Sequence, residues 1–177
     1  MVPRQAMILG GARSGKSTFA ECLVDYYHKS KVYIATSQAL DVEMQDRIDT
    51  HTARRGADWH TIEAPMDVAT PLAAATDDQV ILLDCATLWL SNQMLAGADL
   101  ALETDRLIDA LCHCAADIVV VSNEVGQGIV PDNQLARRFR DEQGRLNQRL
   151  AAAADLSVLV VAGLPLVLKG ALPDGLT

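Results

Sequence analysis

The sequence predicts an α/β fold, with a mainly parallel central sheet and helices on both faces. Three observations predict it. Short apolar runs alternate with helical patterns along the whole chain. The runs are almost continuous Val, Ile and Leu, which is typical of strands buried on both faces of a parallel sheet. The chain has 177 residues, of which 50% are hydrophobic, so we expect residues 1–177 to form a single domain.

Six apolar runs are the expected strands, and helical patterns fill the intervals between them. The expected strands are 6–10, 31–36, 79–85, 117–124, 156–163 and 164–169, and the expected helices are 16–29, 39–55, 86–95, 99–116 and 132–154. The last two strands are close enough to form a hairpin. Residues 53–66 are expected to be the loosest segment. Ligands of such sheets bind beyond the carboxyl ends of the strands, where the motifs below fall.

Composition limits the kinds of partner. The formal net charge is −8 and the sequence pI is about 4.8, which argues against a nucleic-acid-binding surface. No stretch reaches the ~20 apolar residues of a membrane span, and the first residues do not read as a secretory signal. We therefore expect a cytoplasmic protein with no stable membrane insertion.

The four cysteines are Cys22, Cys85, Cys112 and Cys114. The sequence "CHC" at 112–114 raises the possibility of a metal site. Residues two apart on a helix point in different directions, however, and no second ligand pair has a suitable spacing. Reduced cysteines that pack in the core are the favoured interpretation.

A phosphate-binding loop is the clearest motif. "GGARSGKS" matches G-x-x-x-x-G-K-[ST], follows an expected strand and opens an expected helix, which is the context of a P-loop NTPase. Its residues are Gly10, Gly11, Ala12, Arg13, Ser14, Gly15, Lys16 and Ser17. Backbone N–H groups and the helix N-terminus would bind phosphate oxygens, Lys16 would reach the β- and γ-phosphates, and Ser17 would contact Mg²⁺. The motif predicts that the chain binds a nucleoside triphosphate such as GTP or ATP.

Two strand ends add acidic residues to this edge. Asp84 follows an apolar run, where a carboxylate can hold the Mg²⁺ shell. Glu124 precedes Gly126 and Gly128 in a segment that either bounds the second substrate or forms a plain turn. No N-K-x-D stretch is present, so composition and spacing set no base preference.

His51 lies near the end of the expected helix 39–55. Met44, Ile48 and His51 share one helix face, which directs the imidazole toward protein or a cleft. Nearby arginines could neutralise phosphate; they are Arg47, Arg54 and Arg55. The pattern leaves two interpretations open: a partly buried or capping histidine, or a nucleophile, which would have to be neutral although the helix dipole favours imidazolium.

Long ordered stretches resemble one family. "GGARSGKS", "YIATSQALDVEMQDRIDTH", "SNEVGQGIVPDNQLARRFRDEQGRLNQRLAAAAD" and "VLVVAG" are similar to the bifunctional adenosylcobinamide kinase / adenosylcobinamide-phosphate guanylyltransferase, over about residues 6–169. The resemblance implies a RecA-like fold and a homotrimer. It also implies two reactions: adenosylcobinamide is phosphorylated by ATP or GTP, and GMP then passes from GTP through a guanylylated histidine to adenosylcobinamide phosphate.

The resemblance also assigns residues. The guanylylated histidine falls on His51, which Thr50 precedes where the family often has a second histidine. Nucleotide contacts fall on the loop 10–17 and on Ala35, Thr36, Ser37, Thr52, Ala53, Arg54, Arg55, Glu63 and Asp84. Lys16 and His51 are the implied catalytic residues, and Ser17 and Asp84 the implied Mg²⁺ ligands.

Two other functions compete with this one. A P-loop kinase of a small metabolite would leave His51 a bystander and would form no covalent nucleotide. A RecA-like regulatory NTPase module would hydrolyse slowly, depend on a partner and usually present a basic polymer-binding surface, which the acidic pI disfavours.

Overall fold

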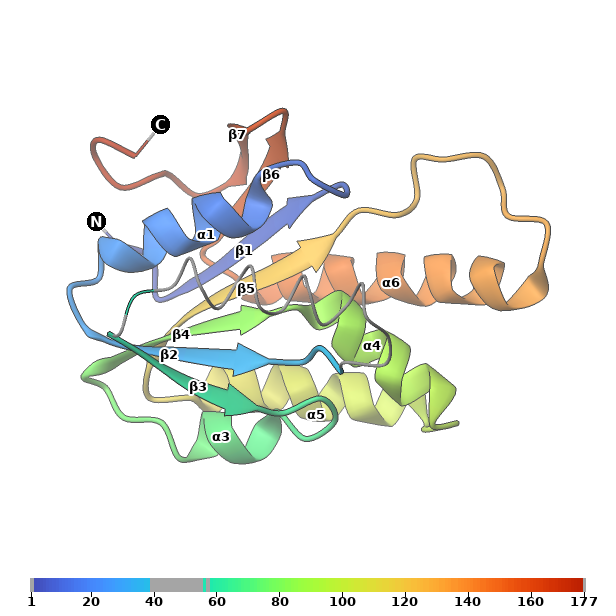
Figure 1. The fold of residues 1–177 in the computed structure, drawn as a ribbon, viewed down its shortest axis with the longest axis horizontal. Helices are drawn as coiled ribbons and strands as arrows, with labels where there is room; N and C mark the ends of the chain where they lie inside the picture. The colour runs from blue at the N-terminus through green and yellow to red at the C-terminus, as the bar shows by residue number, and fades with distance from the viewer. Residues whose placement is uncertain (1, 39–55, 57, 177) are drawn as a thin grey trace.

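The computed structural model describes residues 2–38, 56 and 58–176. Within them a seven-stranded sheet has the order β3-β2-β4-β5-β1-β6-β7 (Figure 1). The strands are β1 Gln5–Gly10, β2 Ser30–Ala35, β3 Trp59–Glu63, β4 Gln79–Asp84, β5 Asp117–Asn123, β6 Leu156–Val161 and β7 Leu164–Lys169. The helices are α1 Lys16–Asp25, α3 Ala69–Ala73, α4 Ala86–Leu95, α5 Leu100–His113 and α6 Gln134–Ala153. Neighbouring strands are parallel except β6 and β7, which form an antiparallel hairpin.

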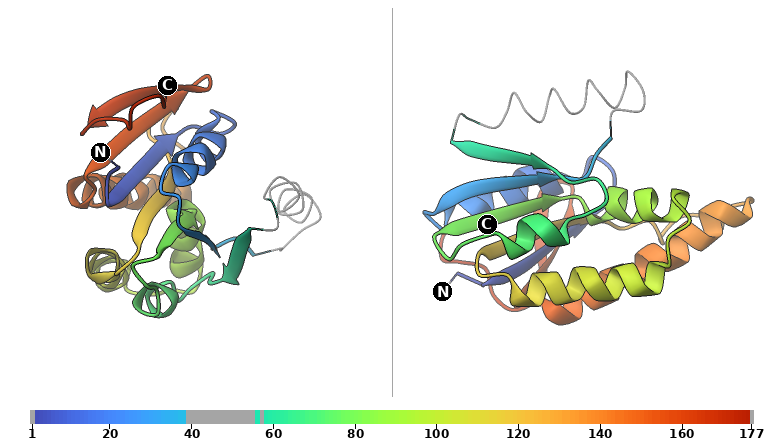
Figure 2. Two further views of the ribbon diagram at one scale, coloured as in Figure 1. Left: turned by 90° about the vertical axis from the view of Figure 1, so that its left-hand side faces the viewer. Right: turned by 90° about the horizontal axis from the view of Figure 1, so that it is seen from below.

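The sheet separates two apolar clusters. Alternate residues of one strand face opposite sides: in β4, Ile81 and Leu83 belong to one cluster, and Val80 and Leu82 to the other. Helix α1 covers one face, whereas α3, α4, α5 and α6 cover the other (Figure 2). The structure thus confirms the expected α/β architecture, because strands buried on both sides require apolar residues at consecutive positions.

Most of the expected elements are present, with small shifts at their ends. All six expected strands form, and the hairpin of the last two is confirmed. Helix α4 has the expected bounds. Helix α1 ends at Asp25 rather than residue 29, since the chain turns there and His28 takes a positive φ of 51°. The expected helix 39–55 lies outside the described residues.

The expectation of a loose segment over 53–66 is wrong in part, because β3 lies within it. This strand pairs with β2 at the edge of the sheet, and all five of its residues are exposed or half-buried. An edge strand has no second neighbour and needs no continuous apolar run, so "WHTIE" gives little strand signal. The short helix α3 that follows was not expected either.

The expectation of packing cysteines is confirmed for Cys85 and Cys114, which are buried, and is wrong for Cys22 and Cys112, which are exposed. All four lie in the described part of the chain and are free thiols, with Cys112 exposed and Cys114 buried at the end of α5. Among the described residues, no three His, Cys, Asp or Glu side chains gather in a way that could hold a metal ion. None of the described helices is long and apolar enough to cross a membrane.

Candidate nucleotide site

The phosphate loop, Gly10–Ser17, connects β1 to α1 at the carboxyl edge of the sheet. Arg13 has φ 57° and Gly15 has φ 93°, so left-handed residues interrupt the chain just before the helix begins at Lys16. Such alternation turns successive backbone N–H groups toward one concavity. The first N–H groups of α1 have no partner within the helix and face the same region. The loop therefore presents the backbone donors that a phosphate requires.

Two glycines let the loop pack closely against the β6–β7 hairpin. A Cβ on Gly10 would meet the side chain of Ser14 and lie 2.7 Å from the carbonyl oxygen of Val160. A Cβ on Gly15 would lie 3.1 Å from the Cα of Gly163. The N–H of Gly163 also donates to the carbonyl of Ser14 at 2.8 Å. The hairpin turn therefore packs directly against the phosphate loop.

That turn has two central residues with positive φ, Ala162 at 52° and Gly163 at 80°. Positive φ at both positions is the type I′ geometry that matches the twist of the flanking strands.

Lys16 lies over the loop that precedes it. Its ammonium donates to the carbonyl oxygen of Gly11 at 3.2 Å, which places the charge beside the loop rather than in bulk solvent. The hydroxyl-bearing Ser17 follows on the first turn of α1 and is half-buried. Ala12 and Arg13 are exposed at the tip of the loop.

The ends of β2, β3 and β4 bring three predicted residues into one row. Ala35 pairs in register with Glu63 on one side and with Asp84 on the other. Strands lie about 4.8 Å apart, so the two acidic residues are about 10 Å from each other across β2. Glu63 is exposed and Asp84 is half-buried. The row lies at the same edge of the sheet as the phosphate loop.

Thr36 fixes the junction between β2 and the segment after β4. Its buried hydroxyl donates to the carbonyl of Cys85 and accepts from the N–H of Cys85, both at 2.8 Å. Its own N–H donates to the carbonyl of Asp84, and its carbonyl accepts from the Asn92 side chain. A nucleotide contact through Thr36 stays a prediction, and its polar groups already have protein partners. Ser37, next along the chain, is half-buried.

Cys85 is the buried thiol nearest to this row. Burial raises its pKa to about 12, and the charge of Asp84 adds to the effect. The thiol is therefore protonated and acts as a packing group rather than as a nucleophile.

The residues predicted to bind Mg²⁺ have suitable chemistry. Mg²⁺ prefers oxygen ligands and is usually held by one or two carboxylates together with substrate phosphates. Ser17 offers a hydroxyl and Asp84 a carboxylate at the edge where the loop would place the phosphates. The donor set therefore fits this ion.

Five of the predicted site residues lie outside the described residues. They are His51, Thr52, Ala53, Arg54 and Arg55, whose roles stay predictions.

Sequence reasoning missed a buried polar group behind the end of β5. Its members are Thr87, Ser122, Gln143 and Asn147, which are all buried and joined by hydrogen bonds. The available signal was the spacing of Gln143 and Asn147, four residues apart on α6 and on the same face as Leu146 and Leu150. Polar residues on the core-facing side of a helix indicate a buried hydrogen-bond network rather than a solvent-exposed helix face.

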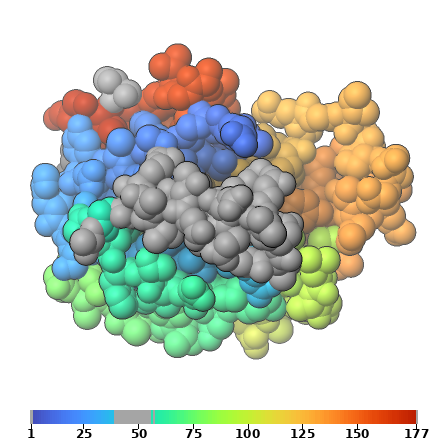
Figure 3. Space-filling view, in the orientation of Figure 1, coloured from blue at the N-terminus to red at the C-terminus, as the bar shows by residue number. Residues whose placement is uncertain are grey.

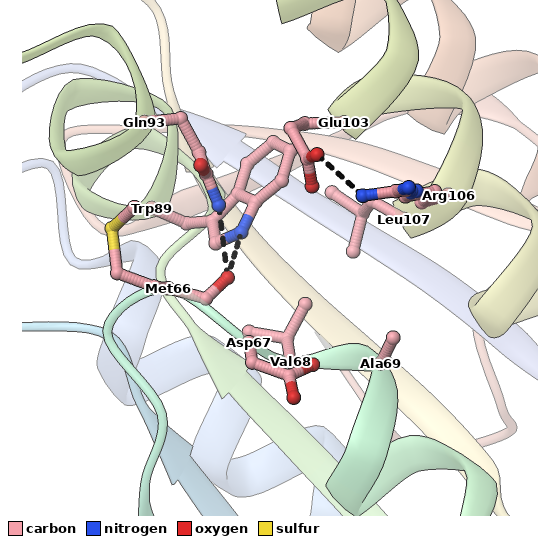
Figure 4. Close-up of a pocket in the computed structure, with 9 residues that line it drawn as sticks. All are labelled: Met66, Asp67, Val68, Ala69, Trp89, Gln93, Glu103, Arg106 and Leu107. Atoms are coloured by element: carbon pink, nitrogen blue, oxygen red, sulfur yellow. Dashed lines mark hydrogen bonds and ion pairs between the residues drawn. The ribbon is translucent and has the colours of Figure 1, made fainter. Parts of the chain in front are cut away.

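A separate cavity lies between α3, α4 and α5 (Figure 4). It has a volume of about 440 Å³, and its lining includes Trp89 and Gln93, which both donate to the carbonyl of Met66. Glu103 and Arg106 form an ion pair at 2.8 Å beside it. None of the predicted nucleotide-site residues that the structure describes lines this cavity.

Comparison with known proteins identifies the family of the chain. Residues 6–168 match the model of the family CobU, described as cobinamide kinase / cobinamide phosphate guanyltransferase. The chain is 44% identical to the bifunctional adenosylcobalamin biosynthesis protein CobP of Pseudomonas aeruginosa, over 93% of this chain and 96% of that protein. It is also 44% identical to the protein CobU of Salmonella typhimurium, which has the same description, over 92% of this chain and 98% of that protein.

Among solved structures, the RadB recombinase has a similar fold. The TM-score is 0.51 at 13% sequence identity, over 89% of this chain and 74% of RadB. At this identity the likeness concerns the fold alone, and it confirms the expected RecA-like P-loop architecture. The match of the family model over most of the sequence decides the relationship: the chain belongs to the cobinamide kinase / cobinamide phosphate guanyltransferase family.

Proposed function

We propose that this chain phosphorylates adenosylcobinamide with ATP or GTP and then transfers GMP from GTP to adenosylcobinamide phosphate, using one nucleotide site for both steps. The observation that carries the proposal is the family match over residues 6–168, joined to a phosphate loop at the edge of the sheet that also carries Asp84 and Glu63. The two relatives described above are each named as bifunctional.

In the kinase step, the loop N–H groups and Lys16 bind the β- and γ-phosphates. The hydroxyl of adenosylcobinamide attacks the γ-phosphorus, a P–O bond forms, and the bond to the bridging oxygen breaks to release the nucleoside diphosphate. A Mg²⁺ ion that enters with the nucleotide, held by Ser17 and Asp84, would offset the charge of the phosphates. The chain itself supplies orientation and fixed positive charge.

In the transferase step, His51 attacks the α-phosphorus of GTP. A P–N bond forms while pyrophosphate leaves, and a phosphate oxygen of adenosylcobinamide phosphate then displaces the histidine to give adenosylcobinamide-GDP. The covalent intermediate divides one difficult transfer into two easier ones. The attacking imidazole must be neutral, and the phosphoramidate stores the GMP between the two transfers.

We further propose a cytoplasmic homotrimer that binds no nucleic acid. Free thiols at all four cysteines are consistent with a reducing compartment. Two groups of exposed apolar side chains support self-association. One is on the β6–β7 hairpin, at the top of Figure 3, and the other is on the segment between β5 and α6, at its right. The hairpin exposes Leu164 and Leu168, and the segment exposes Ile129, whose exposed fraction is 97%. Buried between copies, such surfaces would stabilise an oligomer. Sedimentation equilibrium would measure the number of copies.

Labelling with GTP tests the proposal. The enzyme is incubated with GTP carrying ³²P at the α-position, denatured, and examined for protein-bound label. We expect an acid-labile, base-stable label on the wild-type protein and none on His51→Ala. His113→Ala, an exposed histidine at the end of α5, is the matched control and should label fully.

Kinase activity, measured in parallel with γ-labelled ATP, separates this proposal from its rivals. A wild-type protein that phosphorylates adenosylcobinamide but takes up no α-label is a simple kinase. Equal label on the wild-type protein and on His51→Ala would show that a residue other than His51 carries the GMP.

A further inference from the structure

We infer that Glu124 is a further carboxylate of the nucleotide site, which holds the divalent cation bound with the triphosphate, and that Gln143 and Asn147 position it. The inference rests on the proposed function, because it assigns residues to the same nucleotide site.

The register of the sheet places Glu124 closer to the phosphate loop than Asp84. Strand β5 is the direct neighbour of β1, and Gly10 pairs with Asn123. The N–H of Glu124 donates to the carbonyl of Gly10, the first residue of the loop, at 3.1 Å. Asp84 is on β4, one strand farther out, and pairs with Val121, two residues before the end of β5. The backbone of Glu124 is thus one strand from the loop, whereas that of Asp84 is two strands away, at about 4.8 Å per strand.

The peptide unit between Asn123 and Glu124 is held on both sides. Its N–H binds the carbonyl of Gly10, and its carbonyl accepts a hydrogen bond of 3.1 Å from the side-chain amide of Asn147 on α6. The preceding N–H, of Asn123, donates to the hydroxyl of Thr87 on α4 at 2.8 Å. Three elements therefore fix the direction in which the chain leaves β5, and with it the start of the Glu124 side chain.

Asn147 is itself oriented by Gln143. The side-chain oxygen of Asn147 accepts from Gln143 at 2.9 Å and from the hydroxyl of Ser122 at 2.7 Å. Those two donors leave the amide nitrogen of Asn147 to face Asn123. Gln143 also donates to the hydroxyl of Ser122 at 3.0 Å, so it acts on the end of β5 both directly and through Asn147.

A contribution to stability does not by itself account for this network. Gln143 is 0% exposed, and its side-chain oxygen has no hydrogen-bond partner among the described residues. A buried polar atom without a partner costs about 1–3 kcal/mol, and apolar residues of the same shape often pack without that cost. A network that carries this local cost and still orients the strand end beside the phosphate loop fits a positioning role.

The carboxylate of Glu124 has a local partner that makes a clean substitution possible. It accepts a hydrogen bond of 2.6 Å from the N–H of Gly126. A glutamine at 124 can accept the same bond, so Glu124→Gln removes the negative charge while it keeps the turn.

The first experiment measures cation binding by Glu124→Gln. Mn²⁺ binding is followed by electron paramagnetic resonance with a non-hydrolysable GTP analogue present, and the Mg²⁺ dependence of the kinase is measured beside it. We expect the affinity for the cation to fall about 10- to 100-fold, as is usual when a group that supports a metal is lost. Glu142→Gln, a change on α6 of a residue whose carboxylate pairs with Arg145, is the control and should bind Mn²⁺ like the wild type.

Unchanged Mn²⁺ affinity in Glu124→Gln would overturn the assignment. The titration uses a GTP analogue and no corrinoid, so it tests Glu124 even if the wild-type protein fails to phosphorylate adenosylcobinamide, the result that would sink the proposed function.

The second experiment tests positioning with Gln143→Met, which keeps the size of the side chain and removes its polar atoms. We expect weaker Mn²⁺ binding and a lower kcat, an almost unchanged KM for ATP, and a melting temperature equal to or above that of the wild type. A lower melting temperature with wild-type Mn²⁺ affinity would show that Gln143 serves only the core.

Discussion

The two halves of the sheet's carboxyl edge are built differently. Around β1, β5 and β6, the connections are tied by backbone hydrogen bonds, from Glu124 to Gly10 and from Gly163 to Ser14. Around β2, β3 and β4, backbone bonds such as that from Thr36 to Asp84 are supplemented by side chains, above all the hydroxyl of Thr36 and the amide of Asn92. The first half offers the backbone donors of the phosphate loop together with the carboxylate of Glu124, whereas the second offers the side-chain carboxylates of Glu63 and Asp84.

This difference suggests how the site divides its work. Backbone donors suit phosphates, which every nucleoside triphosphate shares, and they require glycines and fixed φ values. Side chains suit the parts of a reaction that differ between enzymes of one fold, because they can be exchanged without moving the chain. Substitutions in the first half should therefore abolish reactions, and those in the second should weaken the fold or redirect chemistry.

The largest effect should come from Lys16→Ala, because this residue adds the only side-chain charge that the loop directs toward the β- and γ-phosphates in the proposed mechanism. We expect kcat/KM to fall about 10²- to 10³-fold in both the kinase and the transferase reaction, the usual effect of removing one donor from a charged transition state. Lys29→Ala is the control, since Lys29 pairs with Asp117 at the amino end of the sheet. Loss of only one of the two activities would contradict a shared site.

Thr36→Val should have an intermediate effect, on stability. The valine has the same shape but leaves the N–H of Cys85 without its partner and removes one of two donors to the Cys85 carbonyl, which also accepts from the N–H of Trp89. We expect the free energy of unfolding to fall by about 1–3 kcal/mol, measured by urea titration. Thr36→Ser keeps the hydroxyl and should lose much less. A valine variant as stable as the wild type would show that the two halves are not held differently.

The smallest effect concerns Cys85 in the folded protein. Because burial raises its pKa to about 12, we expect iodoacetamide at pH 8 to modify the exposed Cys22 and Cys112 and to spare Cys85, as read by mass spectrometry. The raised pKa also means that this thiol contributes stability that is lost as the pH rises above its ordinary value of 9.0, since only the unfolded chain then releases the proton. Rapid labelling of Cys85 would indicate that this half of the edge opens readily.

The sequence predicted the central strands well and the edge poorly. Strands β1, β2, β4, β5 and β6 are buried on both faces, so their composition alone identifies them. Strand β3 depends on pairing with β2, which is a long-range contact that a local pattern does not contain. The phosphate loop was predictable because its glycines are required by backbone geometry within a few residues.

The same distinction explains which site residues were missed. Ser122, Gln143 and Asn147 act together only after α6 packs behind β5, and each alone is an ordinary polar residue in the sequence. The proximity of Glu124 to the phosphate loop follows from the strand order, in which β5 pairs directly with β1 although the two strands are far apart in the sequence. Such juxtapositions arise from topology, and spacing does not encode them.

The contact between the phosphate loop and the β6–β7 turn has a consequence for engineering. An exposed two-residue turn is ordinarily a permissive place to insert a tag or a fused domain. Here an insertion between Ala162 and Gly163 would displace the N–H of Gly163, which donates a hydrogen bond to the carbonyl of Ser14. Because this single hydrogen bond joins the turn to the phosphate loop, an insertion at the turn would disturb the loop. The turn is therefore a poor site for a fusion, although it is exposed.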